Sequence, residues 1–194
     1  MANIDCKPSK YMLNLLHVLS PFANEEEAVV NCIIEINAGS INKYEIITES
    51  GQLKLDRVGY SSLAYPFAYG AITKTWDEDG DPLDIEIVNV TEPLVPGSIV
   101  EARIIGVMKF VDGGEVDDKI IAVINDDKRV SEIKSIADLG GHFEKETTYY
   151  WEHYKDLKKP GTGKVEGFFG VEEAVKVVKS CAERYDKDYA PKFD

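Results

Sequence analysis

Residues 98–111 read Ser-Ile-Val-Glu-Ala-Arg-Ile-Ile-Gly-Val-Met-Lys-Phe-Val, a long run of apolar and β-branched residues. Turn-forming residues enclose this run, with Pro96-Gly97 before it and Gly113-Gly114 after it. Such a run between turn signals is typical of a β-strand. Runs of the same kind occupy residues 28–36, 43–48, 53–58, 84–90 and 119–125. The sequence therefore predicts a mainly β protein whose strands pack as a meander or a small barrel.

The last part of the chain changes to helical spacing, over residues 140–157 and 171–186. In the second segment, apolar residues recur at intervals of three and four from Val171 to Tyr185, which is typical of a stripe that packs on a core. The segment 160–163, Pro-Gly-Thr-Gly, separates the two predicted helices. Because no repeat, low-complexity tract or linker interrupts the chain, residues 1–194 are predicted to form a single domain.

The overall charge narrows the class of partner. The formal net charge of -13 argues against nucleic acid or an anionic membrane, because both are bound chiefly through an excess of Lys and Arg. No run approaches the roughly 18 apolar residues that a membrane span requires. Any anionic substrate must therefore meet a local concentration of positive charge.

The cysteine count indicates a compartment. Cys6, Cys32 and Cys181 are odd in number and too scattered for a disulfide framework or a zinc ribbon. The short apolar run 11–19 is interrupted by Asn14 and His17, so it is not a convincing secretory signal. The sequence therefore predicts a protein of the reducing cytoplasm.

Two acidic clusters lie about thirty positions apart. The first contains Asp77, Glu78, Asp79, Asp81 and Asp84, and the second contains Asp112, Glu115, Asp117 and Asp118. Two carboxylates about 4 Å apart repel by roughly 4 kcal/mol at an effective dielectric of 20, so a fold that gathers several of them needs cations. Carboxylate oxygens suit hard cations. The clusters therefore predict a site for several Mg²⁺ ions, with Mn²⁺ as a substitute.

Two other interpretations of the first cluster stay open at this point. Asp, Gly and Pro are all turn formers, so the segment also fits a solvated turn without a metal. A calcium loop would use Asp77, Asp79 and Glu86 as ligands, but Thr75 stands where the first ligand of such a loop should be Asp. The flanks of the cluster also resemble strands rather than the helices that enclose a calcium loop.

Basic and aromatic residues form a complementary set: Lys43, Arg57, Lys119 and Lys155, with Tyr65, Tyr69 and Tyr154. Each alone fits a solvated cation or a half-buried core tyrosine, and only their joint presence beside the acids favours a site for phosphate groups. His17, His142 and His153 lack metal-ligand spacing. The sequence also lacks a serine nucleophile elbow, a Walker loop and a dinucleotide fingerprint, which leaves direct attack by a metal-activated water.

An ordered series of motifs runs through these residues. It begins with Glu35 in Ile-Ile-Glu-Ile, Lys43-Tyr44-Glu45, Asp56-Arg57, Tyr65-Pro66, Tyr69-Gly70 and the hexapeptide Asp-Gly-Asp-Pro-Leu-Asp at 79–84, and it ends with Asp112, Asp117, Lys119 and His-Tyr-Lys-Asp-Leu at 153–157. The series resembles the soluble inorganic pyrophosphatases of family I, over roughly residues 28–170. Any one motif is a weak signal, whereas the ordered set is highly specific.

The resemblance implies a fold and an activity. The fold is a five-stranded barrel of the oligonucleotide-binding (OB) type, flanked by two carboxyl-terminal helices, in an α+β protein that is mainly β. The activity is that of an inorganic diphosphatase, the hydrolysis of pyrophosphate to two phosphates with several Mg²⁺ ions. The lengths of bacterial relatives suggest a homo-oligomer, with a hexamer favoured.

The resemblance also implies roles for individual residues. Asp79, Asp84, Asp112 and Asp117 are expected to hold metals, and Glu45 to contact a further metal through water. Asp81 is expected to orient or deprotonate the attacking water, with Glu35 and Tyr65 in supporting positions. The residues expected to grip phosphate groups are Lys43, Arg57, Tyr69, Lys119, Tyr154 and Lys155.

Two departures from the family pattern concern residues outside this set. Relatives often have proline after the Ile-Glu-Ile strand, where this chain has Asn37, and a further lysine shortly beyond the Tyr-Lys pair, where this chain has the segment 160–163. Lys164 is the one candidate to replace that charge.

Two functions compete with pyrophosphate hydrolysis. A metal-dependent phosphatase acting on nucleotides or sugar phosphates would use similar acids with a larger pocket. An OB-type barrel can also bind single-stranded nucleic acid through aromatic stacking and a basic groove, which the net charge of -13 disfavours.

Overall fold

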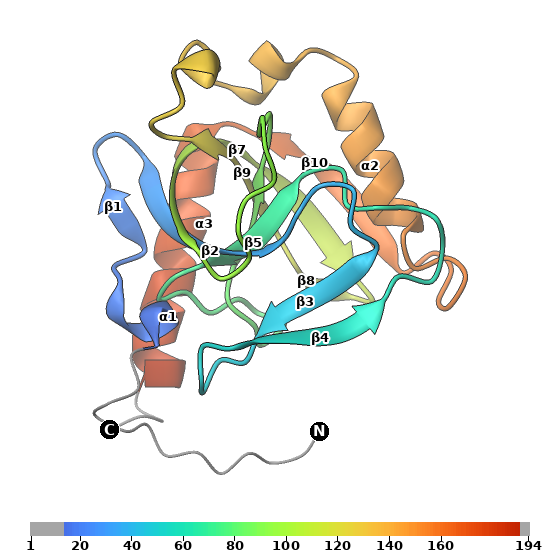
Figure 1. Ribbon diagram of the computed structural model, residues 1–194, viewed down its shortest axis with the longest axis horizontal. Helices are drawn as coiled ribbons and strands as arrows, with labels where there is room; N and C mark the ends of the chain where they lie inside the picture. Colours follow the sequence, from blue (N-terminus) through green and yellow to red (C-terminus); the bar gives the residue numbers. More distant parts are fainter. Residues whose placement is uncertain (1–13, 191–194) are drawn as a thin grey trace.

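The computed structural model describes residues 14–190, and a closed barrel of five strands forms its centre (Figure 1). In order around the barrel, the strands are β2 (Val29–Ile36), β5 (Ala68–Ile72), β6 (Asp84–Ile87), β9 (Lys119–Ile124) and β7 (Ile99–Asp112). Neighbouring strands are antiparallel except β6 and β9, and the pairing of β7 with β2 closes the ring. The predicted five-stranded barrel is confirmed.

The remaining strands extend or flank the barrel. Strand β1 (Phe22–Asn24) pairs with β2, while β8 (Glu115–Val116) and β10 (Gly163–Phe169) pair with β7. Strands β3 (Asn42–Ile46) and β4 (Leu53–Val58) form a hairpin that is a sheet of its own. This hairpin lies beside the barrel (Figure 1).

The helices pack on the outside of the barrel (Figure 1). They are α1 (Leu15–Val18), α2 (Phe143–His153) and α3 (Val171–Arg184), which continues into the π-helical turn η3 (Tyr185–Tyr189); the 3₁₀ turns η1 (Lys128–Val130) and η2 (Ile136–Leu139) precede α2. No helix in the described part of the chain is long and apolar enough to cross a membrane.

Two apolar clusters bury both faces of the barrel wall. In β9, Ile120 and Ala122 belong to the cluster that includes α3, whereas Ile121 and Val123 belong to the cluster that includes α2. This division follows from geometry, since successive side chains of a strand point to opposite faces. The apolar stripe of α3 lies in the first cluster as predicted, with its buried members Ala174, Val177, Val178 and Cys181.

The sequence missed four strands. Strand β5 is only five residues long and contains Gly70, so it lacks the β-branched run that identifies the other barrel strands. Strand β10 begins at Gly163, the last residue of the segment 160–163 that was expected only to separate the two helices. Strands β1 and β8, with three and two residues, are too short for periodicity to detect.

The first predicted helix is shorter than expected. It spans Phe143–His153 rather than 140–157. Gly140 has φ = 83°, outside the right-handed helical region, so the helix begins only after it. Beyond His153 the chain forms turns up to β10.

Gly70 is required where β5 pairs with β2, opposite Ile34. A Cβ atom built on Gly70 would lie 2.1 Å from the backbone oxygen of Ile33. We expect Gly70→Ala to destabilise the fold by about 1–3 kcal/mol, the usual cost of overpacking. Gly141→Ala is the control, because its Cβ would meet no heavy atom within 4 Å. Urea unfolding of both variants checks this, and an unchanged midpoint for Gly70→Ala would contradict the packing argument.

Candidate active site

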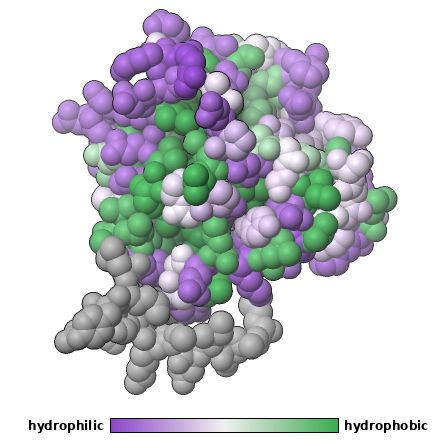
Figure 2. All heavy atoms as spheres, viewed as in Figure 1, coloured by the Kyte–Doolittle hydropathy of each residue, from purple (hydrophilic) through white to green (hydrophobic). Residues whose placement is uncertain are grey.

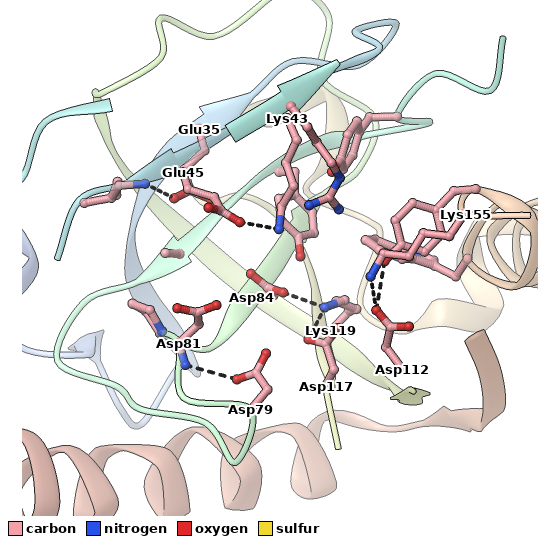
Figure 3. A pocket seen from close by; sticks show the side chains of 18 of the residues that line it. Glu35, Lys43, Glu45, Asp79, Asp81, Asp84, Asp112, Asp117, Lys119 and Lys155 are labelled. Atoms are coloured by element: carbon pink, nitrogen blue, oxygen red, sulfur yellow. Dashed lines mark hydrogen bonds and ion pairs between the residues drawn. The ribbon is translucent and has the colours of Figure 1, made fainter. Parts of the chain in front are cut away.

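A pocket of about 240 Å³ opens between the barrel, the β3–β4 hairpin and the end of α2 (Figure 3). Every residue that the sequence proposed for the site lines this one pocket: Glu35, Lys43, Glu45, Arg57, Tyr65, Tyr69, Asp79, Asp81, Asp84, Asp112, Asp117, Lys119, Tyr154 and Lys155. The fold therefore brings together side chains that lie up to 120 positions apart in the chain.

The loop between β5 and β6 presents two of the acids as a tight turn. The amide of Asp77 donates to the carbonyl oxygen of Asp81 at 2.7 Å, and Gly80 adopts φ = 89° at the corner. The amide of Asp81 donates to Oδ1 of Asp79 at 3.1 Å. At the base of the loop, buried Thr75 accepts from the amide of Leu83 at 3.0 Å. The turn thus holds Asp79 and Asp81 at the mouth of β6.

Lys119 is the buried cation of the site, with 1% of its surface exposed. It begins β9 directly opposite Asp84, the first residue of β6, in the parallel pair of strands. Its ammonium group contacts the carboxylates of both Asp84 and Asp117. Burial alone would lower the pKa of Lys119, but these two carboxylates outweigh it and raise the pKa.

The end of β7 meets the end of α2 on another side of the pocket. Lys155 Nζ contacts Oδ2 of Asp112, and the hydroxyl of Tyr154 donates to the same oxygen at 3.2 Å. Burial opposes the ionisation of Asp112, but the hydrogen bond and charge of Lys155 outweigh it and lower the pKa of the carboxyl.

The β3–β4 hairpin supplies the facing wall. Lys43 and Arg57 are paired across the two strands, and each has an acid nearby, Glu45 for Lys43 and Asp56 for Arg57. Below them, Glu35 lies where the register between β2 and β5 shifts, and it accepts from the amide of Ile46 at 2.7 Å. Burial, with a smaller contribution from Asp84, raises the pKa of Glu35 to about 8.

The two carboxyls of the turn, Asp79 and Asp81, have too little nearby positive charge to offset their burial and the charges of neighbouring carboxylates. Burial, followed by the nearby charges of Asp117 and Asp84, raises the pKa of Asp79 to about 7. Burial, followed by Asp84 and Glu45, raises the pKa of Asp81 to about 6. Desolvated carboxyls that repel one another gain free energy when a cation joins them, so this donor set fits a hard divalent cation.

The acids are not gathered into a ready-made ligand cage. Across residues 14–190, no three carboxyl, imidazole or thiol side chains converge as a metal-ligand group. The reason is visible in Figure 3, where Asp84 and Asp117 turn toward Lys119, and Asp112 turns toward Lys155. The lysines neutralise these acids in this arrangement.

The calcium-loop interpretation is wrong. Glu86, which would be a ligand, lies inside β6 and is 1% exposed, with Trp151 Nε1 donating to it at 2.7 Å. The acidic turn is flanked by strands β5 and β6 and not by helices.

Trp151 and Glu115 also line the pocket, although the sequence gave neither a role. Trp151 lies in the last turn of α2, three residues before its C-cap Tyr154 and four before Lys155, and this helical spacing is typical of side chains that lie near one another. That spacing could have identified Trp151. Glu115 was named only as a member of the second acidic cluster, and it lies exposed in β8.

Neither departure supplies a residue that lines the pocket, but the segment 160–163 reaches it, because the side chain of Thr162 hydrogen-bonds Asp112 and helps to lower the pKa of that carboxyl. The side chain of Asn37 exchanges two hydrogen bonds with the backbone of Leu94, at 2.7 and 2.8 Å, and so ties β2 to the loop before β7. Lys164 is exposed on β10 and pairs with Glu166, so its position does not support a replacement of the missing charge.

Comparisons with known proteins identify relatives along most of the chain. The family model for inorganic pyrophosphatase matches residues 32–186. The inorganic pyrophosphatase of Neisseria meningitidis serogroup B is 44% identical over 91% of this chain and 99% of its own length. That of Geobacillus stearothermophilus is 43% identical over 84% of this chain and 97% of its own.

Solved structures agree with this match. The inorganic pyrophosphatase of Neisseria gonorrhoeae superposes with a TM-score of 0.84 at 44% identity, covering 89% of this chain and 99% of that one. The enzyme from Thermus thermophilus gives a TM-score of 0.82 at 38% identity, covering 90% and 99%.

The barrel, its pocket and these relatives define a class of protein, the hydrolases built on an OB-type barrel. Fold alone would not separate hydrolases from other OB-type proteins, because this barrel hosts many activities. The family match makes the assignment specific: the chain belongs to family I of the inorganic pyrophosphatases.

The raised pKa of Asp79 makes the stability depend on pH. A carboxyl with a folded-state pKa of about 7 and a usual value of 3.8 stabilises the fold only while it is protonated, so this contribution is lost as the pH rises from about 4 to 7. Asp79→Asn should therefore raise the melting temperature at pH 8 with chelator present, by about 2–4 °C for an effect of roughly 1 kcal/mol. Asp126→Asn, at an exposed site, is the control, and the gain should vanish at pH 3.5.

Arg184 of α3 clamps the back of the acidic turn. It donates to the carbonyl oxygen of Trp76 at 2.8 Å and to Glu78 at 3.0 Å, and it lies 3.4 Å from buried Asp77. Arg184→Met should cost about 1–3 kcal/mol in urea unfolding, because Asp77 loses its cation, and adding Asp77→Asn should recover part of the loss. Exposed Lys187→Met should change little; equal effects of Arg184→Met and Lys187→Met would refute the clamp.

Proposed function

We propose that this chain hydrolyses inorganic pyrophosphate to two phosphates, with Mg²⁺ as cofactor and Mn²⁺ as a substitute. The observation that carries the proposal is that one small pocket joins a wall of carboxyls to a wall of Lys and Arg in a chain of this family. A volume of about 240 Å³ lies below the range of about 300–1,000 Å³ usual for pockets that hold larger ligands, which favours a small anion.

The carboxyls would hold the metal ions. Asp79, Asp84, Asp112 and Asp117 offer the hard oxygen donors that Mg²⁺ prefers, and Glu45 would contact a further ion through water. When bound, magnesium supplies positive charge to the phosphate oxygens and lowers the pKa of a coordinated water. The same carboxyls would then exchange their contacts with Lys119 and Lys155 for contacts with the metals, which frees both ammonium groups for substrate.

The cations would bind and orient the substrate. Arg57 can hold two phosphate oxygens at once through its planar fork, whereas Lys43, Lys119 and Lys155 act as point charges. Tyr69 and Tyr154 would donate hydrogen bonds. Phosphoryl transfer depends mainly on such positioning and on stabilising the charge that develops as the bridge breaks.

Asp81 would orient the attacking water and accept its proton. It lies on the same turn as Asp79, three residues before Asp84 at the start of β6, and it lines the pocket. With cations bound at Asp79 and Asp84, Asp81 would be ionised near neutral pH, as a general base must be. Glu35 and Tyr65 would support the neighbouring carboxyls and cations from the floor of the pocket.

The chain is further proposed to be a single domain that forms a homo-oligomer in the cytoplasm, with a hexamer favoured. Helices α2 and α3 both pack on the same barrel, which supports a single domain. Buried Cys32 and Cys181 are free thiols, as expected in a reducing compartment.

Exposed apolar surface supports the proposed homo-oligomer. Such surface is visible near β2 and the β3–β4 hairpin in Figure 2, and exposed residues include Val18, Leu55, Val58 and Val95. Light scattering checks the oligomeric state.

Phosphate release tests the activity directly. We expect rapid release from pyrophosphate with Mg²⁺, little from ATP or sugar phosphates, and none after chelation. Preference for ATP would instead indicate a nucleotide phosphatase. Salt-sensitive binding of an oligonucleotide without hydrolysis would indicate a nucleic-acid-binding barrel.

Replacing Asp81 tests its role. Asp81→Asn should keep the fold and most metal binding but lower kcat by about 100-fold or more, the usual scale for a positioned base. Asp126→Asn, exposed and remote from the pocket, should keep full activity. Circular dichroism confirms the fold of both variants, and near-normal turnover by Asp81→Asn would remove that residue from the mechanism.

A further inference from the structure

Glu86 is a buried acid that lies beneath the pocket. It is in the middle of β6, two residues after Asp84, and only 1% of its surface is exposed. Its Oε1 accepts a hydrogen bond from Nε1 of Trp151 at 2.7 Å, and its Oε2 has no hydrogen-bond partner within residues 14–190. An acid in such a place costs free energy that an apolar side chain of similar size would avoid.

The partner of Glu86 is the centre of an aromatic cluster. The ring of Trp151 lies near five other rings, with centroid distances from 5.1 to 6.3 Å: Tyr65, Tyr69, Phe110, Tyr150 and Tyr154. Three of these neighbours, Tyr65, Tyr69 and Tyr154, line the pocket together with Trp151. The orientation of the indole therefore affects the wall that faces the substrate.

The same ring supports the buried cation of the site. Nζ of Lys119 lies 4.9 Å from the centroid of the Trp151 ring, and 5.7 Å from the centroids of Tyr69 and Phe110. A cation over aromatic faces is attracted by their quadrupoles, most strongly by Trp and more so when water is excluded. Lys119 is 1% exposed, so this attraction acts with little screening.

We propose that Glu86 is a positioning residue for Lys119. By accepting the indole N–H, Glu86 fixes the rotation of Trp151, and the fixed ring sets the position of the Lys119 ammonium that meets the phosphate. This role rests on the proposed hydrolysis of pyrophosphate. A purely structural pair would change only the stability when broken and leave substrate binding unchanged.

Three substitutions separate these roles. Glu86→Leu removes the acceptor, whereas Glu86→Gln keeps a carbonyl oxygen that can accept the same hydrogen bond. Trp151→Phe keeps an aromatic ring over Lys119 and removes the donor. We expect Glu86→Leu and Trp151→Phe to raise the KM for pyrophosphate about 10-fold, the lower end of what loss of an outer contact costs, with kcat changed less than about 3-fold. Glu86→Gln should stay close to the unmodified protein.

The indole N–H gives a readout independent of activity. The chain has two tryptophans, so the ¹H–¹⁵N indole signal that is absent from Trp151→Phe belongs to Trp151. We expect this signal to shift in Glu86→Leu and to remain nearly in place in Glu86→Gln. An unshifted signal in Glu86→Leu would overturn the proposal, because the hydrogen bond would not control the ring.

Calorimetric titration with inorganic phosphate and Mg²⁺ distinguishes a failure of this proposal from a failure of the proposed function. Weaker phosphate binding by Glu86→Leu, restored in Glu86→Gln, supports the positioning role even if pyrophosphate is not hydrolysed. Equal binding and equal KM in all variants, whatever the change in melting temperature, would overturn it. Should Glu86→Leu fail to fold, Trp151→Phe carries the same test.

Discussion

The parallel pairing of β6 with β9 is the constraint on which the site depends. It places Asp84 and Lys119 opposite each other at the start of two adjacent strands, in the one parallel contact of the barrel. Parallel strands need a long connection. Here that connection contains β7 and the turn before β9, so it also delivers Asp112 and Asp117 to the same end of the barrel. One topological feature therefore gathers acids from both sequence clusters around a single buried ammonium group.

The buried acids of this arrangement lower the stability of the fold, although the proposed function needs them. Burial and the charges of neighbouring carboxylates raise the pKa of both carboxyls of the turn, Asp79 and Asp81. Because a bound cation would relieve this repulsion, these carboxyls are well suited to hold one. Hydrogen bonds hold the turn in place in spite of this repulsion. Thr75 binds the turn from the barrel side, and Arg184 binds it from α3. Natural proteins often keep such destabilised groups where activity requires them.

Much of the fold and of the site could be predicted from the sequence. The long barrel strands have periodic apolar residues between turn signals. The residues proposed from the ordered motifs, from Glu35 to Lys155, all line one pocket. The missed elements have physical reasons. Strand β5 must contain Gly70 to pair closely with the backbone of β2, and this glycine hides its strand character. Trp151 resembles a core residue until its spacing from Tyr154 and Lys155 is considered. The contact of Lys119 with Asp84 depends on the parallel register of β6 and β9, which lie far apart in the sequence, so the local motifs did not reveal it.

The β3–β4 hairpin has a consequence for how such an enzyme can change over evolution. It carries Lys43, Glu45 and Arg57, yet it is a sheet of its own that shares no strand pairing with the barrel. Its link to the barrel floor runs through local contacts such as the amide of Ile46 with Glu35. Insertions or deletions at its tip would leave the barrel's hydrogen-bond ladder intact. Under the proposed function this hairpin would bind substrate, so that side of the pocket could diversify while the barrel stays fixed.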